Sequence, residues 1–99
     1  MITYEVTAEV REDLRSRYEL YMRDRHIPDV LATGLFLGAS FLRADDGRYQ
    51  ARYLFDDRES YDRYIATHAG RLRADFTVHF PEGISLDRDA WTVIAEWPH

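Results

Sequence analysis

The sequence predicts an α+β protein whose elements follow the order strand, helix, strand, strand, helix, strand. Three observations predict this order: residues 2–10 alternate apolar and polar side chains, two later segments repeat apolar side chains at helical spacing, and Asp46-Gly47 is a hairpin signal between two segments typical of strands. Right-handed crossovers then place the first and third strands side by side, as in the ferredoxin-like fold. We expect one such domain over residues 1–99, with both helices on one face of an antiparallel sheet.

The first strand has a clear polarity. One face carries Ile2, Tyr4, Val6, Ala8 and Val10, and the other carries Thr3, Glu5, Thr7 and Glu9. Pairing with the third strand, residues 48–55, can place Glu5 opposite Arg52 and Glu9 opposite Arg48. Because cross-strand pairs of opposite charge contribute roughly 0.2–1 kcal/mol each, we predict this register.

The first helix is predicted over residues 12–25, where Leu14, Tyr18, Tyr21 and Met22 recur at helical spacing. Pro28 disfavours helical geometry in the residue before it, so we expect the helix to end near His26. A short turn should follow over residues 29–33, with Gly34 as its stop. At a helix C-terminus, the dipole favours the protonated form of His26.

The second strand is predicted over residues 35–44. If Asp46-Gly47 is a two-residue loop, Ser40 lies opposite Tyr53 and Leu42 lies opposite Ala51. This register places Leu42 under the helices, and it places Leu37, Phe41 and Leu54 on the open face of the sheet.

The second helix is predicted to begin at a capping box, Asp56-x-x-Glu59. One side of this helix carries Tyr61, Tyr64, Ile65, His68, Leu72 and Phe76. Gly70 costs about 1 kcal/mol relative to alanine in a helix, so we expect a kink or break near Ala69. The last strand is predicted over residues 91–97, with its start a few residues earlier.

Composition excludes several classes of function. The chain has no cysteine, which rules out disulfides and thiolate chemistry, and its net charge of −5 argues against nucleic-acid binding. No apolar stretch approaches the roughly 20 residues of a membrane span, and the opening residues do not have the pattern of a signal peptide, so a cytoplasmic protein is expected. No metal-ligand spacing, phosphate loop or nucleophile elbow occurs, and we predict no metal and no cofactor.

The open face of the predicted sheet carries apolar side chains beside paired charges. Such a face would be left in water in a monomer, and apolar patches of several hundred Å² usually mark interfaces. We therefore predict a homodimer formed by stacking two sheets face to face. The alternative is a monomer with a half-polar exposed sheet, which antiparallel sheets tolerate.

Two segments resemble a known family. Residues 26–34, His-Ile-Pro-Asp-Val-Leu-Ala-Thr-Gly, and the pattern Tyr61-x-x-Tyr64-x-x-x-His68-Ala69-x-x-Leu72-Arg73 are similar to signatures of an uncharacterised bacterial family, domain of unknown function 4286. Gly70 stands where proline is expected, and residues 81–89 are longer than usual. The resemblance implies a dimeric α/β-barrel of the kind found in small antibiotic-biosynthesis monooxygenases and polyketide cyclases, and it implies no reaction.

Candidate site residues lie where the helices would cover the sheet. Tyr64 and His68 are one turn apart, so the imidazole could abstract a proton while a tyrosine hydroxyl stabilises the oxyanion that forms. Ligand-binding candidates are Tyr4, His26, Ser40, Tyr53 and Tyr61, whose polar tips would line an apolar wall. These tyrosines could equally fill the core, and His26 and His68 could be structural.

Two functions remain open from the sequence. The first is a small dimeric protein that binds an apolar or aromatic molecule in a helix–sheet pocket and acts as a cofactor-independent cyclase, isomerase or monooxygenase. The second is a non-catalytic ligand-sensing or protein-interaction module. An enclosed void of a few hundred Å³ that touches His68 favours the first, and a filled core favours the second.

Overall fold

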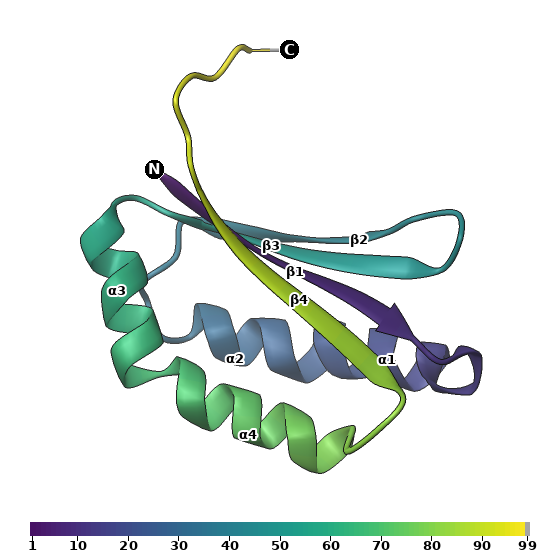
Figure 1. Cartoon of the computed structure of the whole chain (residues 1–99). Coiled ribbons are helices and arrows are strands. Elements are labelled where there is room, and N and C mark those ends of the chain that lie inside the picture. Colours follow the sequence, from purple (N-terminus) through teal and green to yellow (C-terminus); the bar gives the residue numbers. More distant parts are fainter. Residues whose placement is uncertain (99) are drawn as a thin grey trace.

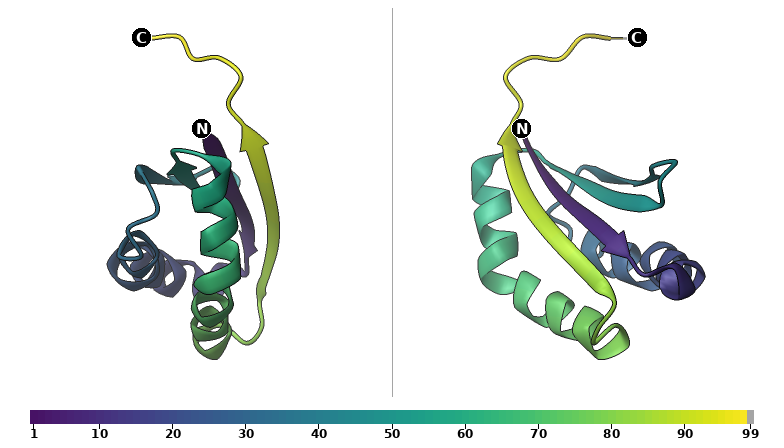
Figure 2. Two further views of the ribbon diagram at one scale, coloured as in Figure 1. Left: turned by 90° about the vertical axis from the view of Figure 1, so that its left-hand side faces the viewer. Right: turned by 45° about the vertical axis from the view of Figure 1, so that its right-hand side comes forward.

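The computed structural model describes residues 1–98 and contains a four-stranded antiparallel sheet. The strands are β1 (Ile2–Val10), β2 (Gly38–Arg43), β3 (Arg48–Phe55) and β4 (Ile84–Thr92), in the order β2-β3-β1-β4. The helices are α1 (Arg15–Tyr21), α2 (Ile27–Leu31), α3 (Arg58–Thr67) and α4 (Ala69–His79), and all lie on one face of the sheet (Figures 1 and 2). The ferredoxin-like α+β fold is confirmed.

The centre of the sheet has the predicted register. Glu5 lies opposite Arg52 and Glu9 lies opposite Arg48, and the Glu5 carboxylate is 3.6 Å from the Arg52 guanidinium. The alternation of β1 and β3 buries one set of side chains under the helices: Ile2, Tyr4, Ala8, Val10, Tyr49, Ala51, Tyr53 and Phe55. Charge pairing and alternation therefore determine this half of the core.

The register predicted for β2 is wrong by one residue. Ala39 lies opposite Tyr53 and Phe41 lies opposite Ala51, because the connection is a three-residue loop, residues 45–47, with Gly47 at φ +87°. The Ala44 N–H donates to the Arg48 carbonyl at 2.8 Å, which closes this loop. A one-residue shift moves every side chain of a strand to the opposite face. Phe41 therefore packs under the helices against Tyr18 and Tyr49, while Ser40 and Leu42 belong to the open face.

The first helical region does not end before Pro28. Between α1 and α2 lies a π-helical segment, Met22–His26, so the chain stays helical from Glu12 to Leu31. Pro28 sits in the first turn of α2, and the wider π-helical turn before it accommodates the proline ring inside a continuous helical region. As a result, His26 lies within the helical region and not at its end.

The remaining boundaries differ in smaller ways. The side chain of Asp57, and not of Asp56, caps α3 by accepting from the Ser60 N–H at 2.8 Å. The predicted break near Ala69 is confirmed, since α3 ends at Thr67 and α4 begins at Ala69. The last strand begins earlier than predicted, at Ile84, and ends at Thr92.

The Val93 N–H still donates to the Met1 carbonyl at 2.9 Å, and residues 94–98 then extend away from the body of the molecule (Figure 1). This tail carries Ile94 and Trp97, which are 96% and 82% exposed, and Trp91 at the end of β4 is 58% exposed. Both tryptophans of the chain therefore lie outside the core. Within residues 1–98, none of the helices has the length and apolar character needed to cross a membrane.

Candidate functional site

A cavity lies between the helices and the sheet, close to the edge strand β4. It is lined by aromatic and aliphatic side chains with one histidine and two arginines: Tyr4, Val6, Tyr18, Met22, His26, Tyr53, Tyr64, Leu72, Arg73, Phe76, Leu86 and Arg88. The interior of the cavity is small, with a volume of about 30 Å³. This volume has room for about two water molecules.

His26 is the polar group that the fold places most unusually. It comes from the π-helical segment, stacks on Tyr21 with ring centroids 5.7 Å apart, and meets Phe76 edge-on at 6.0 Å. Its Nδ1 is buried and has no hydrogen-bond partner among residues 1–98. A buried polar atom without a partner costs about 1–3 kcal/mol, so its retention beside a cavity is typical of a site that receives a ligand or water.

The protonation state of His26 is opposite to the one expected from a helix C-terminus. Burial lowers the pKa of His26 from 6.5 to about 4, with Arg88 acting in the same direction, while Asp75 and Asp29 act against the shift. Desolvation disfavours the charged imidazolium, so the ring is neutral near pH 7. A neutral imidazole can accept a proton from a bound molecule.

Three tyrosines line the cavity together with this ring. The Tyr4 ring lies 6.0 Å from Tyr53 and 6.2 Å from Tyr64, and Arg73 donates a 3.0 Å hydrogen bond to the Tyr4 hydroxyl. Burial raises the pKa of Tyr53, and it raises the pKa of Tyr64 to about 12. Both phenols therefore stay protonated at neutral pH and can donate a hydrogen bond to an oxyanion.

Of the seven residues predicted for the site, four line this cavity: Tyr4, His26, Tyr53 and Tyr64. His68 does not line it. The His68 ring stacks on Tyr64 at 6.5 Å, and Arg71 donates to its Nδ1 at 2.9 Å. Tyr61 packs beside the lining, 5.8 Å from Tyr4, and Ser40 lies opposite Arg52 on the open face because of the shifted register.

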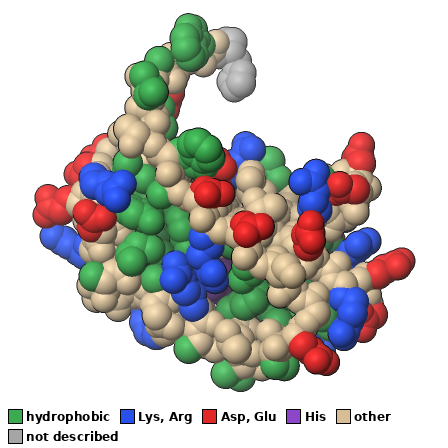
Figure 3. All heavy atoms as spheres, in the orientation of Figure 1, with side chains coloured by type: hydrophobic (Ala, Val, Ile, Leu, Met, Phe, Trp, Pro, Cys, Tyr) green, Lys and Arg blue, Asp and Glu red, His purple; other side chains and the backbone are tan. Residues whose placement is uncertain are grey.

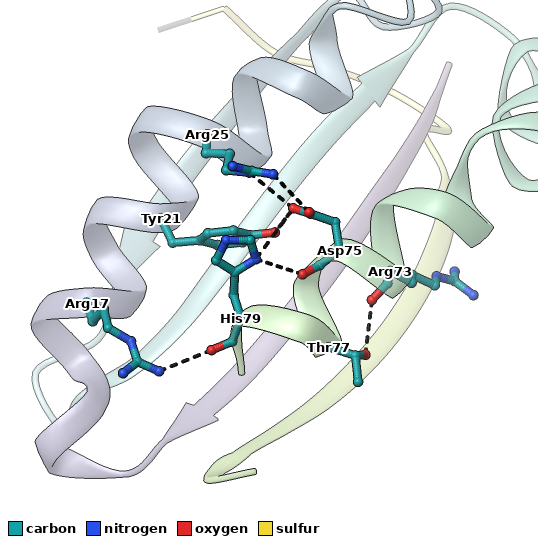
Figure 4. A network of polar contacts seen from close by, with 7 residues as sticks. All are labelled: Arg17, Tyr21, Arg25, Arg73, Asp75, Thr77 and His79. Atoms are coloured by element: carbon teal, nitrogen blue, oxygen red, sulfur yellow. Dashed lines mark hydrogen bonds and ion pairs between the residues drawn. The ribbon is translucent and has the colours of Figure 1, made fainter. Parts of the chain in front are cut away.

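A polar network behind His26 holds the π-helical segment against α4 (Figure 4). The Tyr21 hydroxyl donates to Asp75 at 2.7 Å, Arg25 donates to both oxygens of the same carboxylate, and His79 donates from Nδ1 to the Asp75 carbonyl at 2.9 Å. The Tyr21 hydrogen bond is the main cause of the lowered pKa of Asp75. Because Tyr21 also stacks on His26, this network orients the imidazole.

Sequence reasoning missed the network and the two cavity arginines. The spacing of Tyr21 and Arg25, and of Asp75 and His79, is four residues, which places each pair on one helix face. That spacing was the available signal for the network. No sequence pattern indicated that Arg88 lies at the cavity, because residues 84–90 do not have the apolar pattern of a strand. Within residues 1–98 there is no group of three or more histidine, cysteine, aspartate or glutamate side chains able to hold a metal ion.

Comparison with known proteins identifies the family. The model of a family described as "Domain of unknown function (DUF4286)" matches residues 1–94. The chain belongs to this family. DUF4286 is a family without an assigned activity, and no match was found among curated proteins.

Solved structures with the fold of this DUF4286 chain are distant in sequence. A mutant of SnoaB, a cofactor-independent oxygenase from Streptomyces nogalater, is similar with a TM-score of 0.75 and 15% identity, over 99% of this chain and 98% of that one. A candidate antibiotic biosynthesis monooxygenase from Deinococcus radiodurans gives 0.73 and 11%, over 100% and 98%. A dimeric ferredoxin-like protein from an uncultured marine organism gives 0.65 and 8%, over 99% and 98%. At these identities the similarity establishes the fold alone.

Proposed function

We propose that the chain binds a small aromatic molecule in the cavity between the helices and the sheet and removes a proton from it without a cofactor. The observation that carries this proposal is the state of His26. Its imidazole is neutral and borders an aromatic-lined cavity, and its buried Nδ1 has no hydrogen-bond partner among residues 1–98. In this assignment His26 is the base, and Tyr64 donates to the oxygen on which charge develops. His68, the base expected from the sequence, stacks on Tyr64 and has the role of positioning it.

A cofactor-independent oxygenase is the reaction type that we favour. Proton removal from a benzylic CH₂ next to a carbonyl gives a stabilised carbanion, which can reduce dioxygen directly. One oxygen atom then enters the substrate as a new carbonyl and the other leaves as water, so CH₂ plus O₂ gives C=O plus H₂O. SnoaB, a cofactor-independent oxygenase with a similar fold, supports this choice.

Binding of a ring requires the cavity to enlarge, since a dry cavity that holds benzene measures about 150 Å³. The side chains that border its edge are suited to such movement. Arg73 and Arg88 are exposed and Leu86 is only partly buried, whereas the inner tyrosines are buried. Rotation of Arg88 costs little because its side chain is exposed, whereas rotation of Arg73 also breaks its hydrogen bond to the Tyr4 hydroxyl.

Hydrogen–deuterium exchange of 2-indanone tests the base. This bicyclic ketone has one aromatic ring and activated benzylic CH₂ groups, and its loss of proton signal in D₂O is followed by ¹H NMR. We expect the protein to accelerate exchange by about 10²–10⁴-fold. His26→Gln should abolish the acceleration, whereas His68→Gln should retain most of it. Acceleration lost in His68→Gln but kept in His26→Gln would return the base to His68.

A non-catalytic interaction module is the second candidate, and the small volume of the cavity favours it. About 30 Å³ of interior space is close to a filled core. If 2-indanone exchange proceeds at the buffer rate, and native mass spectrometry of protein purified from cells shows no retained small molecule, this second function replaces the first.

The open face of the sheet is proposed to bind a second copy of the chain. On this face β1 and β4 carry acidic side chains and β3 carries basic ones: Glu5, Glu9, Asp87 and Asp89 against Arg48 and Arg52. A two-fold axis parallel to the strands, between β1 and β3, would place β3 of one copy over β1 of the other. The basic strand of each copy would then face the acidic strand of its partner.

Sedimentation equilibrium tests the dimer. The expected mass is twice the protomer mass of 11.7 kDa. A species of 11.7 kDa at all concentrations up to about 100 μM would contradict this assembly.

A further inference from the structure

Two arginines border the cavity beside β4. Arg73 comes from α4 and Arg88 comes from β4, and both belong to the cavity lining although their side chains are largely exposed. Figure 3 views the molecule from the side of β4 and shows basic side chains in the middle of that view, with part of a histidine visible beside them. The entrance to an aromatic interior is therefore positively charged.

This positive charge contrasts with the rest of the molecule. The chain carries a net charge of −5, and most of its arginines lie within 4.0 Å of a carboxylate. Among residues 1–98, neither Arg73 nor Arg88 has such a partner, and the cavity lining contains no aspartate or glutamate. Asp87 and Asp89 flank Arg88 in sequence, but strand alternation directs them to the open face.

The two guanidinium groups act on polar groups inside the cavity. Arg73 and Arg88 both oppose the effect of burial on the pKa of Tyr64, and Arg88 contributes to the lowered pKa of His26. The Arg73 guanidinium also reaches the Tyr4 hydroxyl at 3.0 Å. The positive charge at the entrance therefore interacts electrostatically with the groups that would contact a bound ring.

We infer that the ligand of this cavity is an aromatic carboxylate, whose ring lies among the tyrosines and whose carboxylate is bound by Arg73 and Arg88. This inference rests on the proposed ligand-binding function and specifies its substrate class. A planar guanidinium matches a carboxylate with two parallel hydrogen bonds, and low-dielectric walls strengthen the interaction. A neutral ring would fill the interior equally well but would leave both cations without an anionic partner.

Benzoate and benzamide form a matched pair of probes, because they share size and shape and differ in charge. Each is titrated into ¹⁵N-labelled protein at pH 7 and followed by amide shift changes around the cavity. We expect benzoate to bind at least tenfold more tightly than benzamide, with an affinity that falls as salt rises from about 20 to about 300 mM. Arg88→Gln and Arg73→Gln should each weaken benzoate binding about tenfold, the effect of a lost charge-assisted hydrogen bond, and should weaken benzamide binding much less because the amide carries no charge.

Arg63→Gln is the matched control, since Arg63 is an exposed arginine on α3 that pairs with Glu59 and does not line the cavity. It should leave both affinities at the wild-type value. Equal affinity for the two probes, or no effect of either arginine substitution, overturns the carboxylate inference while leaving the binding function intact. Absence of shift changes for both probes at about 10 mM overturns the inference and the binding function together.

Discussion

Replacement of His26 by glutamine should remove most of the pH dependence of stability between pH 8 and pH 5. Burial holds the folded-state pKa of His26 at about 4, against 6.5 for an ordinary histidine. The folded state therefore disfavours the proton that the unfolded chain binds. Stability from this group is complete above pH 6.5 and is lost as the pH falls from 6.5 toward 4.

The size of the effect follows from the two pKa values. The free energy of unfolding should fall by about 2 kcal/mol between pH 8 and pH 5, and by about 3 kcal/mol at pH 4, because each pH unit between the two values costs about 1.4 kcal/mol. In this window Asp75, whose charge acts on the ring, stays ionised because hydrogen bonds from Tyr21 and Arg25 lower the pKa of its carboxyl. His26 is thus the main source of the predicted loss.

Urea unfolding followed by far-UV circular dichroism at pH 8, 7, 6 and 5, at one fixed protomer concentration, measures the effect. The unfolding free energy of the wild type minus that of His26→Gln should fall by about 2 kcal/mol from pH 8 to pH 5. His68→Gln is the control for loss of a histidine outside the cavity, and it should keep the wild-type pH dependence. An unchanged pH dependence in His26→Gln would refute the burial argument.

Three further predictions address the packing and the assembly. Tyr21→Phe should lower the unfolding free energy by about 1–2 kcal/mol, measured by urea unfolding, because it removes a hydrogen bond to a carboxylate; an unchanged midpoint would show that the network of Figure 4 is not stabilising. Phe41→Ala should cost about 2 kcal/mol whereas Ser40→Ala should cost less than about 0.5 kcal/mol, and the reverse order would restore the two-residue hairpin register. Glu5→Arg should dissociate the proposed dimer and the double variant Glu5→Arg/Arg52→Glu should restore it, as read by sedimentation; a dimer that persists in Glu5→Arg would exclude this face.

The central half of the fold could be predicted because two independent signals agree there. Alternation in β1 and the charge pairs of Glu5 and Glu9 with β3 select a single register. In β2 the signals were ambiguous. Phe41 and Leu42 are both apolar, so alternation does not choose between the two faces, and Asp46-Gly47 suits a two-residue loop as well as a three-residue one.

The site could be predicted only in part, for two physical reasons. Tyr4, Tyr53 and Tyr64 lie at the helix-facing positions of β1 and β3 and at the sheet-facing positions of α3, and the sequence pattern indicates these positions. The burial and neutral state of His26 depend on a π-helical turn before Pro28, whereas a proline rule that ends the helix there places the ring at a helix C-terminus, where the dipole favours its protonated form. Arg88 belongs to an edge strand in which residues 85–89 contain a single apolar side chain, Leu86, so the segment lacks the apolar density by which strands are recognised.

The exposed positions of Trp91 and Trp97 decide what intrinsic fluorescence can report for this protein. Indole emission from these two side chains begins close to its value in water, so unfolding of the tyrosine-rich interior will change it little. A shift to shorter wavelength on raising the concentration would instead signal that the end of β4 and the tail have become covered. Tryptophan emission of this chain therefore reports association and is nearly insensitive to unfolding.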